Sequence, residues 1–94
     1  MDKNRVMLAL TEKALLLEKD KVLYEMFPEM GFYCTDFLPC IPVTHDALKG
    51  IAEALDMEIE FDEKSDWVRG SINVEIGGHK FEVYELYSKE GEAL

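Results

Sequence analysis

The chain has 94 residues, of which 48% are hydrophobic, 11% aromatic and 32% charged, so it can form one small domain and is too apolar for a disordered tail or a low-complexity linker. Its 20 acidic and 10 basic residues give a formal net charge of -10. Because this charge repels phosphate backbones and anionic lipids, we expect no direct binding to nucleic acid or to a membrane. We predict a single domain over residues 1–94. We also expect a cytoplasmic protein, because the chain has only two cysteines and no signal-peptide pattern at its N-terminus.

The first predicted element is helical and covers residues 3–27. Ala, Leu, Met, Glu and Lys dominate this segment, glycine is absent from it, and Pro28 supplies a stop signal. One long helix fits the pattern, and so do two helices with a break near Asp20. Its apolar residues occupy more than one side, which indicates either burial on two flanks in a small core or a helix-mediated homodimer. The predicted self-association residues are Leu8, Leu15, Leu16 and Leu23.

Residues 28–43 hold all three prolines of the chain among aromatic residues, which predicts an ordered connection rather than a flexible linker. A second helix is predicted over residues 44–55. Thr44 has the character of an N-cap, and Asp46 in the first turn would complement the helix dipole. The apolar residues of this helix form one face at helical spacing.

After Asp56 the hydrophobic period changes from 3.6 to 2, which predicts three strands within residues 57–87 and a frayed tail over residues 88–94. Gly77-Gly78 is a two-residue hairpin signal between the second and third strands. The resulting register places Ile72 opposite Val83 on an apolar face. The predicted fold is an α+β two-layer domain, with N-terminal helices packed on a three-stranded antiparallel β-meander in the order ααβββ or αααβββ.

Acidic residues alternate with apolar residues along the first predicted strand and should line the uncovered sheet face, roughly 6.6 Å apart. The other two strands add carboxylates to this face, and Tyr84 and Leu86 place apolar surface among them, as interface cores do. Such a face either keeps a domain soluble or binds a basic protein. The predicted partner-binding residues are Asp56, Glu58, Glu60, Asp62, Glu75, Glu82, Tyr84 and Leu86.

Residues suited to zinc occur at Cys34, Asp36, Cys40, His45 and His79. Their Cys-x5-Cys-x4-His spacing is looser than that of structural zinc modules. No pattern in the sequence places an imidazole beside a thiol, and no phosphate-binding glycine loop precedes a helix. We therefore predict no metal site, no cofactor and no catalytic residue, and expect a protein that is not an enzyme.

Residues 48–57, with the sequence LKGIAEALDM, resemble the opening helix and turn of repressor-type helix-turn-helix domains, in which a Leu-x-x-Ile-Ala-x-x-Leu pattern is common. That resemblance implies DNA binding through a following recognition helix with basic or amide side chains. Glu58, Glu60 and Asp62 follow instead in a strand pattern. We therefore expect no DNA binding.

The size, charge and two-layer architecture are similar to those of small phage-borne anti-defence proteins and of immunity proteins that neutralise nuclease toxins. This is a likeness of type, and it assigns no binding residues. The first functional prediction is a small acidic interaction module that inhibits a basic nucleic-acid-handling protein through its carboxylate-lined sheet face, as a nucleic-acid mimic would. The alternative is a structural or assembly subunit that forms a homodimer through its apolar N-terminal helix.

Overall fold

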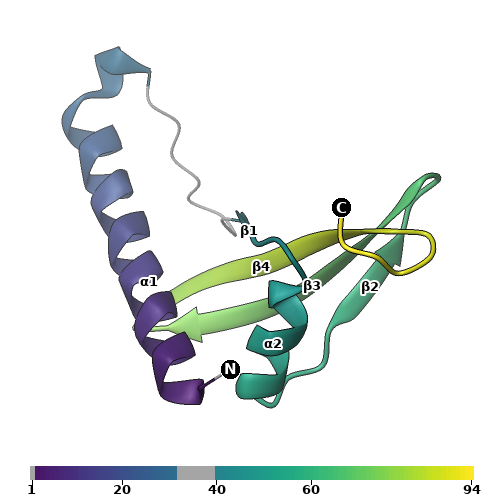
Figure 1. The fold of residues 1–94 in the computed structure, drawn as a ribbon. Helices are drawn as coiled ribbons and strands as arrows, with labels where there is room; N and C mark the ends of the chain where they lie inside the picture. The colour runs from purple at the N-terminus through teal and green to yellow at the C-terminus, as the bar shows by residue number, and fades with distance from the viewer. Residues whose placement is uncertain (1, 32–39) are drawn as a thin grey trace.

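The computed structural model describes residues 2–31 and 40–94 of the chain, and every structural statement below concerns these residues. The elements follow in the order α1 (Lys3–Met26), the 3-10 helix η1 (Pro28–Met30), β1 (Cys40–Pro42), α2 (Ala47–Ala54), β2 (Glu60–Glu63), β3 (Trp67–Ile76) and β4 (His79–Ser88) (Figure 1). The predicted α+β class is confirmed. The element order differs from the prediction because a short strand precedes α2.

The N-terminal helix α1 is continuous, without a break near Asp20. The carboxylate of Asp2 caps it by accepting a hydrogen bond from the backbone N–H of Asn4 at 3.2 Å. The helix ends before Pro28, whose ring and missing N–H cannot continue the α-helical hydrogen bonding. Of the two predicted alternatives, the single long helix is correct.

Helix α2 begins at Ala47, three residues later than predicted, so Thr44 is not its N-cap. The chain enters the helix through left-handed backbone at His45 and Asp46, with φ angles of 57° and 60°. Thr44 contributes only its backbone carbonyl, which accepts a hydrogen bond from the Ala47 N–H at 3.0 Å. Asp46 occupies the N-cap position, but its side chain makes no capping hydrogen bond.

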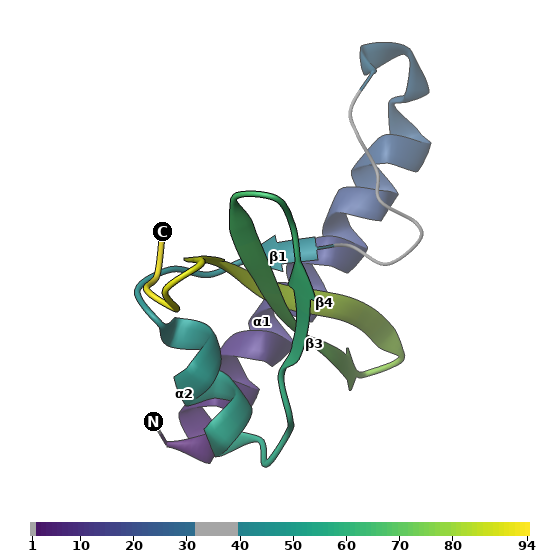
Figure 2. The ribbon, with the colours of Figure 1, turned by 90° about the vertical axis from the view of Figure 1, so that its right-hand side faces the viewer.

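The sheet is mixed and has the strand order β1-β4-β3-β2 (Figures 1 and 2). Strands β2, β3 and β4 form an antiparallel meander, as predicted, but the sheet also contains β1, which pairs in parallel with β4 and places Ile41 opposite Val83. The prediction of a three-stranded sheet is therefore corrected to four strands. Strand β1 has only three residues, one of them proline, so it carries no alternating pattern that would reveal it.

The β3–β4 hairpin has the predicted register. Gly77 and Gly78 form its turn with φ angles of 57° and 79°, which glycine adopts without steric cost. Ile72 lies opposite Val83, and Glu75 lies opposite Lys80. Because opposed residues share a face, this register separates an apolar face from a polar face.

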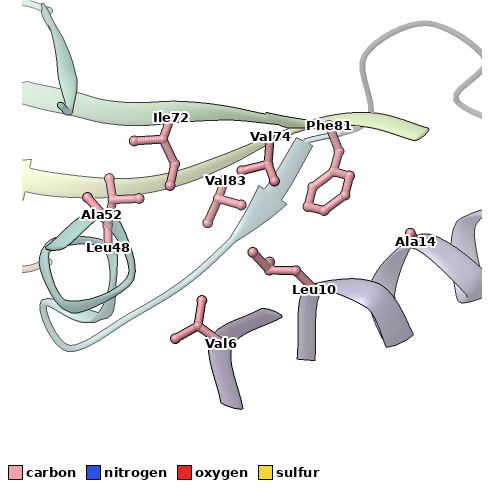
Figure 3. Close-up of a cluster of buried hydrophobic side chains, with 9 residues drawn as sticks. All are labelled: Val6, Leu10, Ala14, Leu48, Ala52, Ile72, Val74, Phe81 and Val83. Atoms are coloured by element: carbon pink, nitrogen blue, oxygen red, sulfur yellow. The ribbon is translucent and has the colours of Figure 1, made fainter. Parts of the chain in front are cut away.

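The core lies between the sheet and the two α-helices, which cover the same sheet face (Figure 3). Its buried side chains are Val6, Leu10, Ala14, Leu48, Ala52, Ile72, Val74, Phe81 and Val83. Gly70 of β3 lies at the edge of this core, where the absence of a side chain permits close packing. A Cβ at this position would lie 2.9 Å from Cε2 of Tyr87 and 3.3 Å from Cδ2 of Leu48. Only the first part of α1 contributes to this core.

The C-terminal tail is tied to β4, in contrast to the frayed tail that was expected. The Leu94 N–H donates to the carbonyl of Leu86 at 3.0 Å, and the Ser88 N–H donates to that of Glu92 at 2.7 Å. Ala93 also forms an isolated bridge with Tyr87. Backbone hydrogen bonds thus fold residues 89–94 back onto the sheet.

Candidate functional site

Strand pairing determines which acidic residues share the sheet face that α1 and α2 leave uncovered. Glu60 of β2 and Tyr84 of β4, for example, both lie opposite Ser71 of β3, so all three side chains are on one face. The same alternation places six of the predicted partner-binding residues together. They are Glu60, Asp62, Glu75, Glu82, Tyr84 and Leu86.

The other two predicted members of this surface, Asp56 and Glu58, are not on the sheet. Strand β2 begins at Glu60, and Asp56 follows α2 with a left-handed φ of 55°. The expected row of four carboxylates along one strand is therefore reduced to Glu60 and Asp62. The apolar side of this strand also differs from expectation, because Phe61 is 59% exposed.

Arg69 lies within the acidic face and was not singled out from the sequence. Its guanidinium forms an ion pair with Glu82, and its Cζ lies 4.5 Å from the centroid of the Tyr84 ring, as in a cation–π contact. Its Nη2 donates a hydrogen bond to Sγ of Cys40 at 3.8 Å. The face thus has a cation among its carboxylates, and the polar–apolar alternation along β3, which puts Arg69 on the same side as Ser71 and Glu75, is the signal that could have located it.

At the β2 edge of this face, Lys64 contacts Asp62, with 2.8 Å between Nζ and Oδ2. The hydrogen bond and the positive charge of Lys64 lower the pKa of Asp62, with a smaller contribution from the charge of Arg69. Asp62 is therefore anionic at neutral pH, but a neighbouring cation offsets its charge. The negative potential of the face is strongest where carboxylates lack such cations.

The second candidate surface is the side of α1 that points away from the core. The exposed fractions there are 63% for Leu8, 53% for Leu15, 59% for Leu16 and 39% for Leu23. We call these four side chains the outer leucines. They are not buried on a second flank of the core, which was one of the two expectations for this helix.

The C-terminal half of α1 extends beyond the sheet and α2, as both ribbon views show (Figures 1 and 2). Every residue from Glu18 to Met26 is exposed, whereas Val6, Leu10 and Ala14 in the first half are buried. One contact to the sheet occurs at the boundary, where Nε2 of His79 lies 3.5 Å from Oε2 of Glu18.

Strand β4 also contributes a buried carboxylate that the sequence analysis missed. Glu85 is 2% exposed and lies on the core face. Its Oε2 accepts a hydrogen bond from the Asp46 N–H at 3.0 Å, and its Oε1 accepts one from the Leu48 N–H at 3.2 Å. The Glu85 carboxylate thus satisfies backbone donors at the start of α2 and replaces the predicted Thr44 cap. Its position between Val83 and Tyr87 on the apolar side of β4 was the available signal.

Tyr87 is buried beside this carboxylate. Burial, together with the negative charges of Glu85 and Asp46, raises the pKa of Tyr87 to about 12. Nζ of Lys49 lies 5.3 Å from the Tyr87 ring centroid, and an open hollow of about 300 Å³ adjoins the ring. Because its phenol stays protonated at neutral pH, Tyr87 is not an activated base or nucleophile.

Among the residues that the structure describes, no group of three His, Cys, Asp or Glu side chains is placed to bind a metal ion. Cys34 and Asp36, two members of the loose zinc pattern, lie outside the described residues.

Comparisons of the chain with protein-family models, curated proteins and solved structures find no match. Among the described residues, no helix is both long enough and apolar enough to cross a membrane. Two surfaces of the described residues are candidates for binding: the acidic sheet face and the outer leucines.

Proposed function

We propose that the chain is a non-enzymatic assembly module that forms a homodimer through the outer leucines of α1. The observation that carries this proposal is the exposure of every residue from Glu18 to Met26 in a helix that continues far beyond its own core. Helices in water depend largely on the packing of an apolar face for their stability. A second copy of α1 would supply that packing to a segment that contains Val22, Leu23 and Met26.

Burial of the four outer leucines would stabilise the dimer. Fully burying one leucine side chain stabilises a protein by about 1.5 to 3 kcal/mol, and a symmetric dimer would bury the set from each copy. These side chains lie on one side of the helix, opposite the residues that pack on the sheet. Dimerisation therefore covers the apolar surface without disturbing the core.

The first experiment measures the molecular mass of the full chain by sedimentation equilibrium, together with the separate variants Leu15→Glu and Leu16→Glu. We expect the parent to have twice the 10.8 kDa mass of one chain and each variant to be a folded monomer. Leu94→Glu is the matched control, because it adds the same charge at an exposed leucine outside α1. The control should remain dimeric.

A parent chain that stays monomeric at millimolar concentration would contradict the proposal. So would a dimer that both α1 variants leave intact. Circular dichroism of each variant separates the loss of association from the loss of folding.

A second candidate function uses the acidic sheet face to bind a basic protein, as in the inhibitor hypothesis. The supporting observation is that α1 and α2 both pack on the opposite face, so Glu60, Asp62 and Glu75 are not covered by either helix. Complementary charge would accelerate the encounter and make binding depend strongly on salt. Arg69 would orient Glu82 and Tyr84 within the contact surface.

This second function is tested by capture from a lysate of the source organism with three tagged proteins: the parent, the Glu60→Lys/Asp62→Lys variant and the Glu90→Lys/Glu92→Lys control. The two variants have the same net charge, but only the first changes the sheet face. A specific basic partner should be retained by the parent and the control, released by high salt, and lost with the sheet variant. Equal retention by all three proteins would exclude the sheet face as the binding surface.

A further inference from the structure

On the exposed side of α1, the leucine positions are the same when read from either end, and the two equivalent charged positions carry opposite charges. Leu15 and Leu16 flank its centre, Glu12 and Lys19 lie at equal distances on the two sides, and Leu8 and Leu23 lie at equal distances farther out. We call this set the outer stripe. Its members are Leu8, Glu12, Leu15, Leu16, Lys19 and Leu23, and all six are exposed.

Resting on the proposed homodimer, we infer that two copies pair their α1 helices antiparallel, with the two-fold axis passing beside the peptide bond between Leu15 and Leu16. Each Leu8 then contacts the partner's Leu23, and each Leu15 contacts the partner's Leu16. Each Glu12 meets the partner's Lys19. The symmetry repeats every contact, as an isologous interface requires.

Charge distinguishes this arrangement from a parallel pair. In a parallel two-fold dimer, Glu12 would face the partner's Glu12 and Lys19 would face the partner's Lys19, so like charges would meet twice. The antiparallel pair replaces both repulsions with two attractions of opposite charge. Neither Glu12 nor Lys19 has an ion pair of its own among the described residues.

The position of α1 in the fold permits this pairing. At about 100° per residue, the outer stripe is centred nearly opposite Val6, Leu10 and Ala14, which face the sheet. Figure 1 shows α1 along one side of the molecule, with the sheet and α2 together on its other side. The two sheets would therefore lie on opposite outer sides of the helix pair.

The inferred pairing also explains the length of α1. The projecting half of each helix would lie along the first half of the partner's helix, so Leu23 would cover the partner's exposed Leu8. The exposed segment from Glu18 to Met26 would thereby gain the packing that its own core does not provide. In this pairing the first half of α1 packs on its own sheet, and the second half packs on the partner's α1.

The decisive experiment is a charge swap in the full chain. Glu12→Lys and Lys19→Glu should each raise the dimer Kd about tenfold or more, because each places like charges together twice. The double variant Glu12→Lys/Lys19→Glu should restore the parent Kd to within about threefold. Glu25→Lys, at an exposed position of α1 outside the stripe, is the control for the change in net charge and should not raise Kd, because it only lowers the net repulsion between the two chains. Sedimentation equilibrium measures all five proteins.

Oxidative cross-linking supplies a second readout in a Cys34→Ser/Cys40→Ser background. The antiparallel pair predicts a disulfide-linked dimer for Leu15→Cys but none for Leu8→Cys, whose two copies would lie ~22 Å apart along the helices. A parallel pair predicts efficient cross-linking of Leu8→Cys.

The results separate this inference from the proposed function. A dimer that dissociates in Leu16→Glu but shows no rescue in the charge swap, or that cross-links through Leu8→Cys, overturns the antiparallel pairing and leaves self-association standing. A parent chain that is monomeric throughout overturns both. Rescue by the double variant together with selective cross-linking of Leu15→Cys supports both.

Discussion

At the scale of single residues, Glu85 connects two parts of the fold that lie far apart in sequence. Its carboxylate belongs to β4 and accepts hydrogen bonds from two backbone amides at the start of α2. A buried amide that loses its acceptor retains the full cost of leaving water, on the order of 1 to 3 kcal/mol. The Glu85 carboxylate thus adds to the packing of Leu48 and Ala52 in holding α2 over the sheet.

We expect Glu85→Ala to lower the free energy of unfolding by about 3 kcal/mol, because one buried and one part-buried backbone donor lose their acceptor and a cavity forms. Urea denaturation followed by circular dichroism measures the change. Glu90→Ala, in the exposed turn after β4, should change stability by less than about 0.5 kcal/mol. Similar values for the two variants would show that the α2 amides find other acceptors.

Tyr87 makes stability depend on pH in the alkaline range. Its pKa is about 12 in the folded chain, compared with 10.0 as the ordinary value, so the unfolded chain releases this proton first. The contribution is fully present below pH 10 and is lost as the pH rises from about 10 to about 12, at up to ~1.4 kcal/mol per pH unit. Tyr87→Phe should remove this component, which urea titrations at several alkaline pH values can measure. The same alkaline slope in both proteins would contradict the prediction.

At the scale of elements, α1 consists of two halves in different surroundings. Val6, Leu10 and Ala14 hold the first half on the core, whereas the segment from Glu18 to Met26 is exposed. Segments with few buried apolar contacts open locally at low free-energy cost. The two halves should therefore differ in backbone protection.

Amide hydrogen exchange should show this difference in the monomeric Leu16→Glu variant, with faster exchange from Glu18 to Met26 than from Val6 to Ala14. If the parent chain forms the proposed homodimer, protection of the second half should rise with protein concentration, because dimerisation is second order in the chain. Exchange that is uniform along α1 at every concentration would contradict both expectations.

The elements that could be predicted are those with local signals. The Gly77-Gly78 turn and the alternation on both sides of it determine the hairpin register, and Pro28 determines where α1 stops. Strand β1 could not be predicted, because it is three residues long and pairs with β4 across a large sequence separation. Non-local pairing of this kind leaves no period in the sequence.

The candidate site was predictable to a similar extent. The alternation of acidic and apolar residues starts at Asp56, but β2 begins only at Glu60. Asp56 and Glu58 were therefore wrongly assigned to the strand, although they belong to the connection between α2 and β2. Arg69 and Glu85 were missed because their roles depend on partners in other strands and helices. For the outer leucines, burial on two flanks was wrong because the side chains are exposed, and the homodimer stays a prediction.

At the scale of the whole molecule, the net charge of -10 acts on the two proposed functions in opposite directions. Two copies of the chain repel each other at long range, and salt screens this repulsion. A basic partner is attracted to the same charge, and salt weakens that attraction.

We therefore expect the dimer Kd to fall as the salt concentration is raised from about 0.05 M to about 0.5 M, because the screened net repulsion outweighs the two exposed Glu12–Lys19 pairs. Binding of a basic protein to the sheet face should weaken over the same range. Sedimentation and binding measurements at matched salt concentrations separate the two surfaces. A dimer that dissociates with rising salt would show that charge pairs, rather than leucines, dominate its interface.

The edges of the sheet limit how this chain can aggregate. One edge is β1, in which Pro42 has no N–H to donate, and the other is β2, where three of the four residues are Glu60, Asp62 and Glu63. Short strands, proline and like charge all oppose the addition of a further strand. Fibril growth by edge-to-edge strand addition is therefore disfavoured at both ends, even though the chain has an exposed apolar helix.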